Sequence, residues 1–212
     1  MSSFTGLWLN QPAPPTTPVP DNAYRPHDAH DVYYVAFLLR QVLVPDLIPP
    51  VLDLAEYWTK TSHHRRDPQS CVEDTAGRPF LSTAVSNAFG PRMVTKVEIS
   101  ITSRDQGWSS FSQSHGTYEG SWTWFEAEVR PSNGGQDCIR RELCRNVHAG
   151  RQYKSHVIEW RYDAEDEEER NLVRSLGGES SISVVPWARF PGWKNNVSCA
   201  SIDVYGAAVR RL

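Results

Sequence analysis

The sequence predicts a mainly β protein: an antiparallel β-sandwich of the jelly-roll type with an N-terminal helical hairpin. From Met93 onward, apolar and polar residues alternate in short runs that are separated by Gly-rich turns, which is typical of antiparallel strands with one buried face. Between residues 28 and 60 the apolar residues instead recur at helical spacing. With 212 residues and eight Trp, the chain is long and aromatic enough to bury one ordinary core.

The chain divides into four predicted segments, namely an arm over 1–26, a helical hairpin over 27–62, a polar loop over 63–91 and the sandwich over 92–212. Six of the fifteen prolines lie between Pro12 and Pro26, and proline opposes both helix and sheet ladders. We therefore expect an extended arm at the N-terminus. It is either a disordered leader or a strap held on the domain by Phe4, Leu7 and Trp8.

The hairpin prediction depends on two apolar stripes. In the first helix, Val32, Val35 and Leu39 share one face, Asp28 is placed to cap the first turn, and Pro45 ends the helix. The second helix begins near Pro49, and its stripe consists of Val51, Leu54, Ala55 and Trp58. Polar and turn-forming residues follow, as expected of a loop.

Within the predicted sandwich, alternation marks strands near residues 97–101, 122–129, 156–162, 182–184 and 202–209. The acidic segment AEDEEERNLVRSLGG interrupts this pattern. Its weak amphipathic spacing predicts a solvated insertion, with a short helix closed by Gly177.

Composition excludes several classes of protein. The net charge of −3 and the pI of about 6.2 argue against a nucleic-acid or anionic-membrane partner. No apolar run reaches the roughly 18 residues that a membrane helix needs. The N-terminus resembles no signal peptide and the four Cys are irregularly spaced, so we expect free thiols in a cytoplasmic or nuclear protein.

No cofactor or metal is predicted. The sequence has no P-loop, no G-x-S-x-G elbow and no G-x-G-x-x-G after a strand. Cys138, Cys144, His148 and His156 are spaced more widely than the paired ligands of zinc sites.

Two segments of the sandwich resemble each other. ISITSRDQGW and ISVVPWARFPGW each run from an alternating strand through a basic residue to a Gly-Trp turn. If both loops lie at the same end of the sandwich, they form one recognition surface. The ligand-binding residues predicted there are Arg104, Gln106, Trp108, Arg189 and Trp193.

The segment SHGTYEGSWTWFEAEV adds Tyr118, Trp122 and Trp124 to these ligand-binding candidates. Strand alternation places Trp122, Trp124, Glu126 and Glu128 on one face, an unusual mixture for either a core or a solvent face. If the site is catalytic, Asp105, His115 and Glu126 are the candidate proton donors and acceptors. The structural alternative is that Asp105 caps its loop while Trp108 packs beneath it.

The segments LIPPVLDLAEYW, TSRDQGWSS, GTYEGSWTWFEA, RNVHAGRQYKSHVIEWRY and ARFPGWKNNV resemble an uncharacterised protein family of filamentous fungi, over about residues 45–212. This resemblance implies a fungal, intracellular, β-rich protein. A weaker likeness is to the galactose-binding-like jelly rolls that follow F-box segments, where a leucine-rich helical piece precedes a sandwich. That likeness is one of architecture, which does not fix function.

Two function classes follow. The first is an intracellular recognition module that binds a polar small molecule, a glycan or a protein segment through aromatic loops. The second is a cofactor-free isomerase or cyclase with an aromatic-lined acid/base pocket. An enclosed pocket around the candidate residues would favour the enzyme, and an open surface would favour recognition. The pattern leaves the oligomeric state open.

Overall fold

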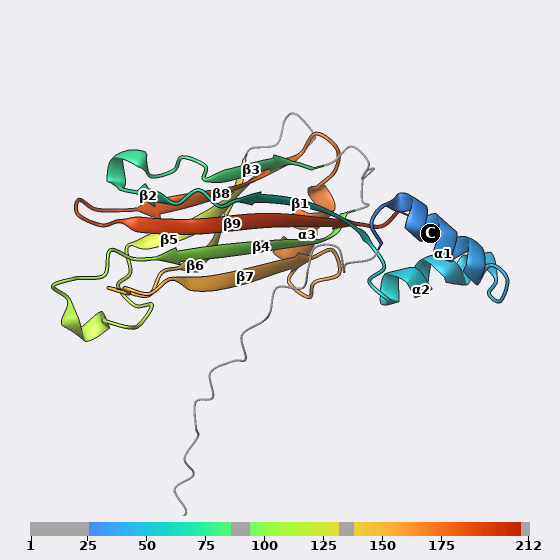
Figure 1. Cartoon of the computed structure of the whole chain (residues 1–212), viewed down its shortest axis with the longest axis horizontal. Coiled ribbons are helices and arrows are strands. Elements are labelled where there is room, and N and C mark those ends of the chain that lie inside the picture. The colour runs from blue at the N-terminus through green and yellow to red at the C-terminus, as the bar shows by residue number, and fades with distance from the viewer. Residues whose placement is uncertain (1–25, 86–93, 132–137, 209–212) are drawn as a thin grey trace, which may run out of the picture.

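The structure of the chain is a computed structural model that describes residues 26–85, 94–131 and 138–208. Two antiparallel β-sheets pack face to face, and a helical hairpin projects from one end of them (Figure 1). The elements in chain order are α1 (Ala29–Leu39), η2 (Pro45–Leu47), α2 (Ile48–Leu54), β1 (Thr59–Arg65), β2 (Gln69–Cys71), η3 (Glu73–Thr75), β3 (Leu81–Ala84), β4 (Val94–Arg104), η4 (Ser112–Ser114), β5 (Thr123–Arg130), β6 (Ile139–Arg145), β7 (Lys154–Arg161), α3 (Glu167–Ser175), β8 (Ser181–Ala188) and β9 (Asn195–Gly206). The predicted fold class is confirmed. Residues 1–25 of the predicted arm lie outside the described part of the chain.

The strand order is that of a jelly roll. One sheet has the order β1-β9-β4-β7, with β2 also paired to β9, and the other has the order β3-β8-β5-β6. If β1 and β2 are counted as one interrupted strand, successive strands alternate between the two sheets except for β5 and β6, which pair within one sheet. The last strand, β9, returns beside the first. None of the helices in the described ranges is long and apolar enough to cross a membrane.

The core lies between the two sheets and follows the predicted alternation. Val97, Ile99 and Ile101 of β4 are completely buried, as are Phe125 and Ala127 of β5 on the facing sheet. Side chains of the two inner faces interdigitate in this way in most sandwiches. The acidic insertion forms α3, as expected; Asp166 caps it, and Leu172 and Val173 close one side of the core.

The prediction of a polar loop over residues 63–91 is wrong, because strands of the sandwich begin at Thr59. β1 and β2 pair with β9, and β3 pairs with β8. These are edge strands, so their stability comes from ladder hydrogen bonds and half-buried polar side chains rather than from an apolar alternation. Arg65 illustrates this: its guanidinium donates to the carbonyl oxygen of Phe80 (2.7 Å) and lies over the Phe80 ring.

The helical hairpin forms as predicted, although its packing face differs. Asp28 accepts hydrogen bonds from the first backbone N–H groups of α1, and Val32 packs against Ile48 and Leu52 of α2. The expected second stripe is not the packing face, since α2 starts at Ile48 and residues 48 and 52 face α1. Leu54, which was part of that stripe, is 89% exposed.

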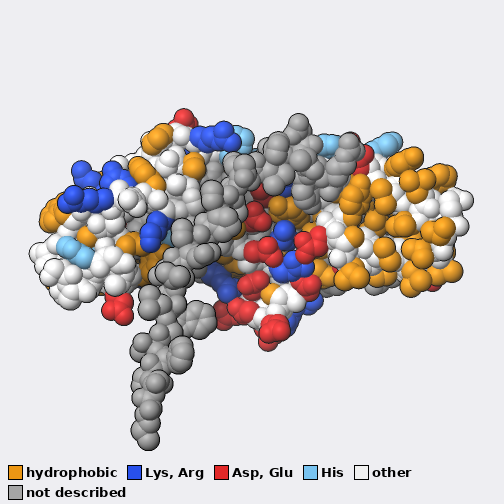
Figure 2. All heavy atoms as spheres, turned by 60° about the horizontal axis from the view of Figure 1, so that its bottom comes forward, with side chains coloured by type: hydrophobic (Ala, Val, Ile, Leu, Met, Phe, Trp, Pro, Cys, Tyr) orange, Lys and Arg blue, Asp and Glu red, His pale blue; other side chains and the backbone are white. Residues whose placement is uncertain are grey.

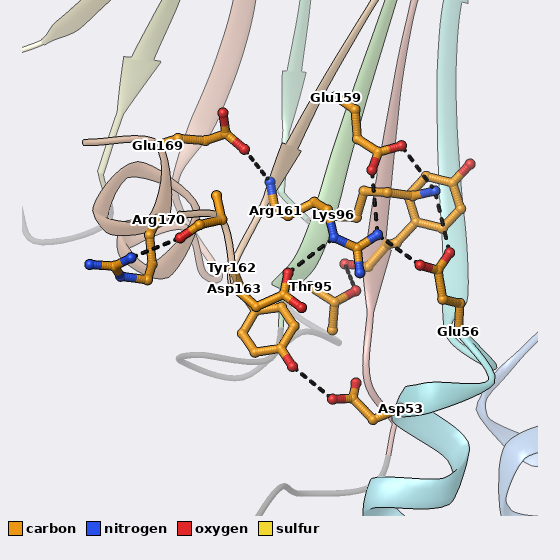
Figure 3. Close-up of polar contacts among 12 residues, drawn as sticks. Asp53, Glu56, Thr95, Lys96, Glu159, Arg161, Tyr162, Asp163, Glu169 and Arg170 are labelled. Atoms are coloured by element: carbon orange, nitrogen blue, oxygen red, sulfur yellow. Dashed lines mark hydrogen bonds and ion pairs between the residues drawn. The ribbon is translucent and has the colours of Figure 1, made fainter. Parts of the chain in front are cut away.

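A cluster of polar residues joins the hairpin to the sandwich (Figure 3). The carboxylate of Asp53, on α2, accepts hydrogen bonds from the Trp58 indole (2.9 Å) and from the Tyr162 hydroxyl (2.8 Å). Next to them, the Arg161 guanidinium donates to Glu56 (2.7 Å) and Asp163 (3.0 Å). The Asp53–Tyr162 and Glu56–Arg161 bonds link the end of the hairpin to the end of β7, so they hold the hairpin in a fixed orientation.

Candidate functional site

The outer face of the β3-β8-β5-β6 sheet presents two tryptophans side by side. Trp124 and Glu126 of β5 point away from the core, as the alternation predicted. The strand register places Trp187 of β8 directly opposite Trp124, and Arg145 of β6 on the other side of it. Three strands thus bring side chains that are far apart in the sequence into one row.

The two indoles stack on each other, and each ring also contacts an arginine. Their ring centroids are 5.7 Å apart with only 7° between the ring planes. The guanidinium of Arg145 lies 5.8 Å from the Trp124 ring, and that of Arg140 lies 5.9 Å from the Trp187 ring. Arg145 is fixed by two hydrogen bonds of 2.7 Å to Glu142. A cation over an indole face is favourable, so these contacts pre-order the stack.

A shallow groove of about 330 Å³ runs along the stack. Its lining residues are Glu73, Ala76, Trp124, Trp187, Ala188 and Arg189. The indole N–H of Trp124 donates to Glu126 (3.0 Å), whereas that of Trp187 is buried and has no acceptor among the described residues. The groove therefore combines an apolar floor with side walls of opposite charge.

Gly77 lies against the Trp187 ring and cannot be replaced easily. Its φ is +79°, which favours glycine, and a Cβ there would lie 3.0 Å from the Trp187 ring. Next to the groove, the Arg189 guanidinium lies over the rings of Trp122 (5.4 Å) and Phe190 (5.5 Å). We call the surface of Trp122, Trp124, Trp187, Arg189 and Phe190 the indole face.

Buried asparagines support the indole face from behind. The side-chain amide of Asn195, on β9, donates to the backbone carbonyls of Trp124 (3.0 Å) and Trp187 (3.3 Å), across the space between the sheets. Asn146 in turn donates to the Asn195 side chain (2.9 Å) and to the Thr123 hydroxyl (3.0 Å). A polar network that is fully bonded in the interior fixes backbone positions, which here are those of the two indoles.

Asp105 belongs to this interior network. It is completely buried, and its carboxylate accepts hydrogen bonds from the Ala149 backbone N–H (2.8 Å) and the Thr123 hydroxyl (3.1 Å). Burial raises the pKa of the Asp105 carboxyl, against the lowering effect of these hydrogen bonds. These contacts match the structural role considered for Asp105, in which the carboxylate bonds to backbone N–H groups. Here it links its own loop to the loop that carries Ala149.

The two loops that resemble each other do lie at the same end of the sandwich, opposite the hairpin (Figure 1). The Lys194 backbone N–H donates to the Gln106 side chain (3.4 Å), and the Asn196 amide donates to the carbonyl of Asp105 (3.2 Å). Trp193 is half-buried, with its ring edge-on to His148 at 5.3 Å.

Trp108 differs from Trp193 in that it is 64% exposed rather than packed under its loop. His115 and Tyr118, on the same long loop, are exposed as well, and the Arg104 guanidinium lies over the Tyr153 ring (5.1 Å). We call the exposed aromatic residues Trp108, Phe111 and Tyr118 the loop tip. Of the predicted ligand residues, Trp122, Trp124 and Arg189 therefore fall on the indole face, and Trp108 and Tyr118 fall on the loop tip. The other three, Arg104, Gln106 and Trp193, belong to neither surface.

The three candidate catalytic residues are not brought together in one cavity. Asp105 lies in the interior, Glu126 lies on the outer face of β5, and His115 sits on the exposed loop with its Nε2 2.9 Å from the Ser109 carbonyl oxygen. Among the described residues, no group of three or more His, Cys, Asp or Glu side chains is placed to hold a metal ion.

Three functional candidates were missed by reasoning from the sequence, namely Glu73, Trp187 and Asn195. Trp187 stands in the segment ISVVPWARFPGW, but its pairing with Trp124 depends on the register between two strands that are distant in the sequence. Glu73 fell within the segment predicted to be a loop. No local signal distinguishes Asn195 from an ordinary turn residue.

No protein-family model matches the sequence, and a search of curated proteins finds no relative. The resemblance to a fungal family therefore stays a prediction. Solved structures similar to this chain include the infectious bursal disease virus Gx strain, with 8% identity and a TM-score of 0.39 over 69% of this chain and 32% of that chain. The chain thus spans about a third of the length of the viral chain.

Two further solved structures have carbohydrate ligands in their descriptions. The EclA C-terminal domain, a sugar-binding protein, shares 10% identity and has a TM-score of 0.26 over 68% of this chain and 78% of that chain. The CBM22-1 xylan-binding domain of Paenibacillus barcinonensis Xyn10C shares 13% identity and has a TM-score of 0.31 over 69% of this chain and 86% of that chain. Similarity this distant carries no argument about a ligand.

Proposed function

We propose that the chain is an intracellular recognition module that binds a neutral glycan or a similar polyol on the indole face, with the aromatic loops at its border. The observation that carries this proposal is the stacked pair Trp124 and Trp187, which floors an open groove between Glu73 and Arg189. Trp124 and Trp187 are half-buried, so part of each ring stays in contact with water, and a ligand that covers this remaining apolar surface gains free energy.

The chemistry of the groove favours hydroxyl groups. A sugar ring has apolar C–H groups that can lie on indole and alanine side chains, and a rim of hydroxyls that both donate and accept hydrogen bonds. The carboxylate of Glu73 would accept from one hydroxyl, and the guanidinium of Arg189 would donate to another. Walls of opposite charge suit a neutral polyol better than an anion, which Glu73 would repel.

Recognition is favoured over the isomerase or cyclase alternative by the positions of the candidate residues. An acid/base enzyme needs its donor and acceptor within hydrogen-bond reach of one substrate. Asp105 is buried in the interior and bonded there, whereas Glu126 lies on the outer face of β5 and the two indoles line an open groove. This arrangement supports a binding role, in which the buried network serves to hold the surface rigid.

The test is a titration of soluble oligosaccharides and polyols, followed by tryptophan fluorescence and calorimetry. We expect Trp187→Ala to weaken binding by about 30-fold or more, as for a hot-spot residue of about 2 kcal/mol. Trp108→Ala, on the loop tip, is the matched control and should bind as wild type does. If no glycan or polyol binds, or if only Trp108→Ala loses binding, the proposed function or its site is wrong.

A further inference from the structure

Helix α1 is apolar on two opposite sides. One side carries Val32, Val35, Ala36 and Leu39, which pack against α2. The other side carries Tyr33, Tyr34, Phe37 and Leu38, which are 47–62% exposed. A helix that is apolar all round is normally buried all round, so the second side is expected to have a partner.

The exposed side of the hairpin continues through its turn and into α2. Exposed large hydrophobic residues there are Val42, Val44, Leu47, Val51 and Leu54. Figure 2 shows hydrophobic side chains gathered over the end of the molecule that the hairpin forms, where few charged groups interrupt them. We call this surface, together with the exposed side of α1, the hairpin patch.

The size of the hairpin patch can be compared with known surfaces. At about 200 Å² per aromatic side chain, the exposed fractions of its three aromatic residues give roughly 350 Å². The aliphatic residues add about as much again, at roughly 100 Å² of apolar surface each. The sum of roughly 700 Å² exceeds the largest patch of a typical monomer and approaches the roughly 800 Å² per partner of a stable dimer.

The hairpin also projects away from the sandwich and is fixed to it at its base. It projects beyond the end of the sheets (Figure 1). Asp53 fixes it to Tyr162, and Glu56 fixes it to Arg161 (Figure 3). A rigid surface loses little conformational freedom when it binds, so it docks at a lower entropic cost than a mobile one.

We propose that the hairpin patch pairs with the same patch of a second copy of this chain, so that two hairpins form a four-helix contact around a two-fold axis. The contact is self-complementary because the sequence between Asp31 and Arg40 holds no charged residue that would meet its own copy. Arg40 follows the exposed side of α1, and Asp46 lies between Val44 and Leu47 of the patch; both are exposed and they are of opposite sign. Antiparallel helices with apolar faces pack in this way in four-helix bundles.

Sedimentation of the full chain at roughly 1–100 µM tests the proposal. We expect a particle of twice 24.0 kDa for the wild type, and one of 24.0 kDa for Phe37→Glu and for Tyr34→Glu. Both side chains are exposed, so these variants should melt with the wild-type sandwich signal. Val157→Glu is the matched control, because Val157 is an exposed apolar residue of β7 on the sandwich, and this variant should remain dimeric.

Three results would overturn the proposal. The first is a wild-type particle of 24.0 kDa at every concentration. The second is a wild-type dimer that Phe37→Glu and Tyr34→Glu leave intact. The third is a monomeric wild type that dimerises only when residues 1–25 are removed, since the chain's own N-terminal segment would then be the occupant of the patch.

Discussion

Buried polar side chains organise the loop end of this sandwich. Asp105, Thr123, Asn146 and Asn195 are each 0–1% exposed, and each makes hydrogen bonds to another member or to a backbone group of a neighbouring strand. Such groups are costly to bury without partners, and each bond therefore depends on the others. Single substitutions in the network should therefore shift the backbone that carries the indole face.

We expect Asp105→Ala to lower the free energy of unfolding by about 3 kcal/mol, because the Ala149 N–H and the Thr123 hydroxyl lose a buried acceptor. Chemical denaturation measures this. Asp67→Ala, at an exposed position in the turn after β1, is the control and should change stability by less than about 0.5 kcal/mol. An equal effect of the two variants would contradict the structural role of Asp105.

The same carboxyl gives an expectation for pH. Burial raises its pKa above that of the unfolded chain, so the folded protein binds this proton more tightly than the unfolded one does. The contribution of Asp105 is then complete below the unfolded pKa and is lost as pH rises through the folded pKa. The stability difference between wild type and Asp105→Ala should therefore grow as the pH is lowered from 7 toward about 4.

The two loop tryptophans should respond differently to truncation. Trp108 is 64% exposed, so Trp108→Ala should leave the melting temperature almost unchanged. Trp193 is half-buried against His148, so Trp193→Ala should cost about 2 kcal/mol, less than the roughly 3–5 kcal/mol expected for Phe125→Ala in the core. Thermal melts of the three variants give the order of their stability losses. A large drop in the melting temperature of Trp108→Ala would show that its ring belongs to the core.

At the scale of elements, the strongly periodic segments were predictable. One face is buried against the core in each of the elements β4, β5, β7 and α1. Their apolar residues therefore recur in the sequence with the period of the strand or helix. β1 and β2 were missed because an edge strand such as TKTSHHR buries mainly polar and long basic side chains. Pairing with β9, rather than its own sequence pattern, makes β1 a strand.

The candidate site was predictable only in part, for a similar reason. Periodicity along one strand places Trp124 and Glu126 on the outer face, and two matching turns place Trp108 and Trp193 at the same end. The meeting of Trp124 with Trp187 and Arg145 depends on the registers of two strand pairs, one of which contains a bulge after Phe125. Register is set by packing across the whole sheet, which no local segment encodes.

The joint between the hairpin and the sandwich gives a prediction at this scale. In Asp53→Ala, the Trp58 indole and the Tyr162 hydroxyl lose a shared acceptor. Because each lost hydrogen bond to this carboxylate is worth about 1.5–3 kcal/mol, we expect faster amide exchange over residues 29–54, with β4 unchanged. Asp46→Ala, on the exposed η2 turn of the same hairpin, should exchange as wild type does; faster exchange in both variants would contradict the assigned role of Asp53.

At the scale of the whole molecule, the two proposed surfaces lie at opposite ends. β9 begins at the loop end, where Asn195 supports the indole face, and ends at Gly206 next to the hairpin. Its 12 residues span roughly 40 Å at the usual rise of a strand. A dimer formed through the hairpins would therefore hold its two indole faces far apart, free to bind two sites on one polymer.

The proline-rich N-terminus gives a whole-molecule prediction. Deletion of residues 1–26 should leave a folded, soluble protein, because such a proline-rich segment cannot supply ladder hydrogen bonds to the sandwich. Circular dichroism and a cooperative thermal melt would check this. An insoluble or non-cooperative truncated protein would mean that the segment is part of the core.

The position of β9 also affects how the protein is made. This strand pairs with β1, β2 and β4, so most of one sheet depends on residues that are synthesised last among the strands. On the ribosome, β1 and β4 must wait, unpaired with each other, until residues 195–206 have left the exit tunnel. Folding that requires such distant segments to meet is slow, and the waiting strands expose edges to other nascent chains. Nascent chains of this protein should therefore depend on chaperones until β9 is inserted.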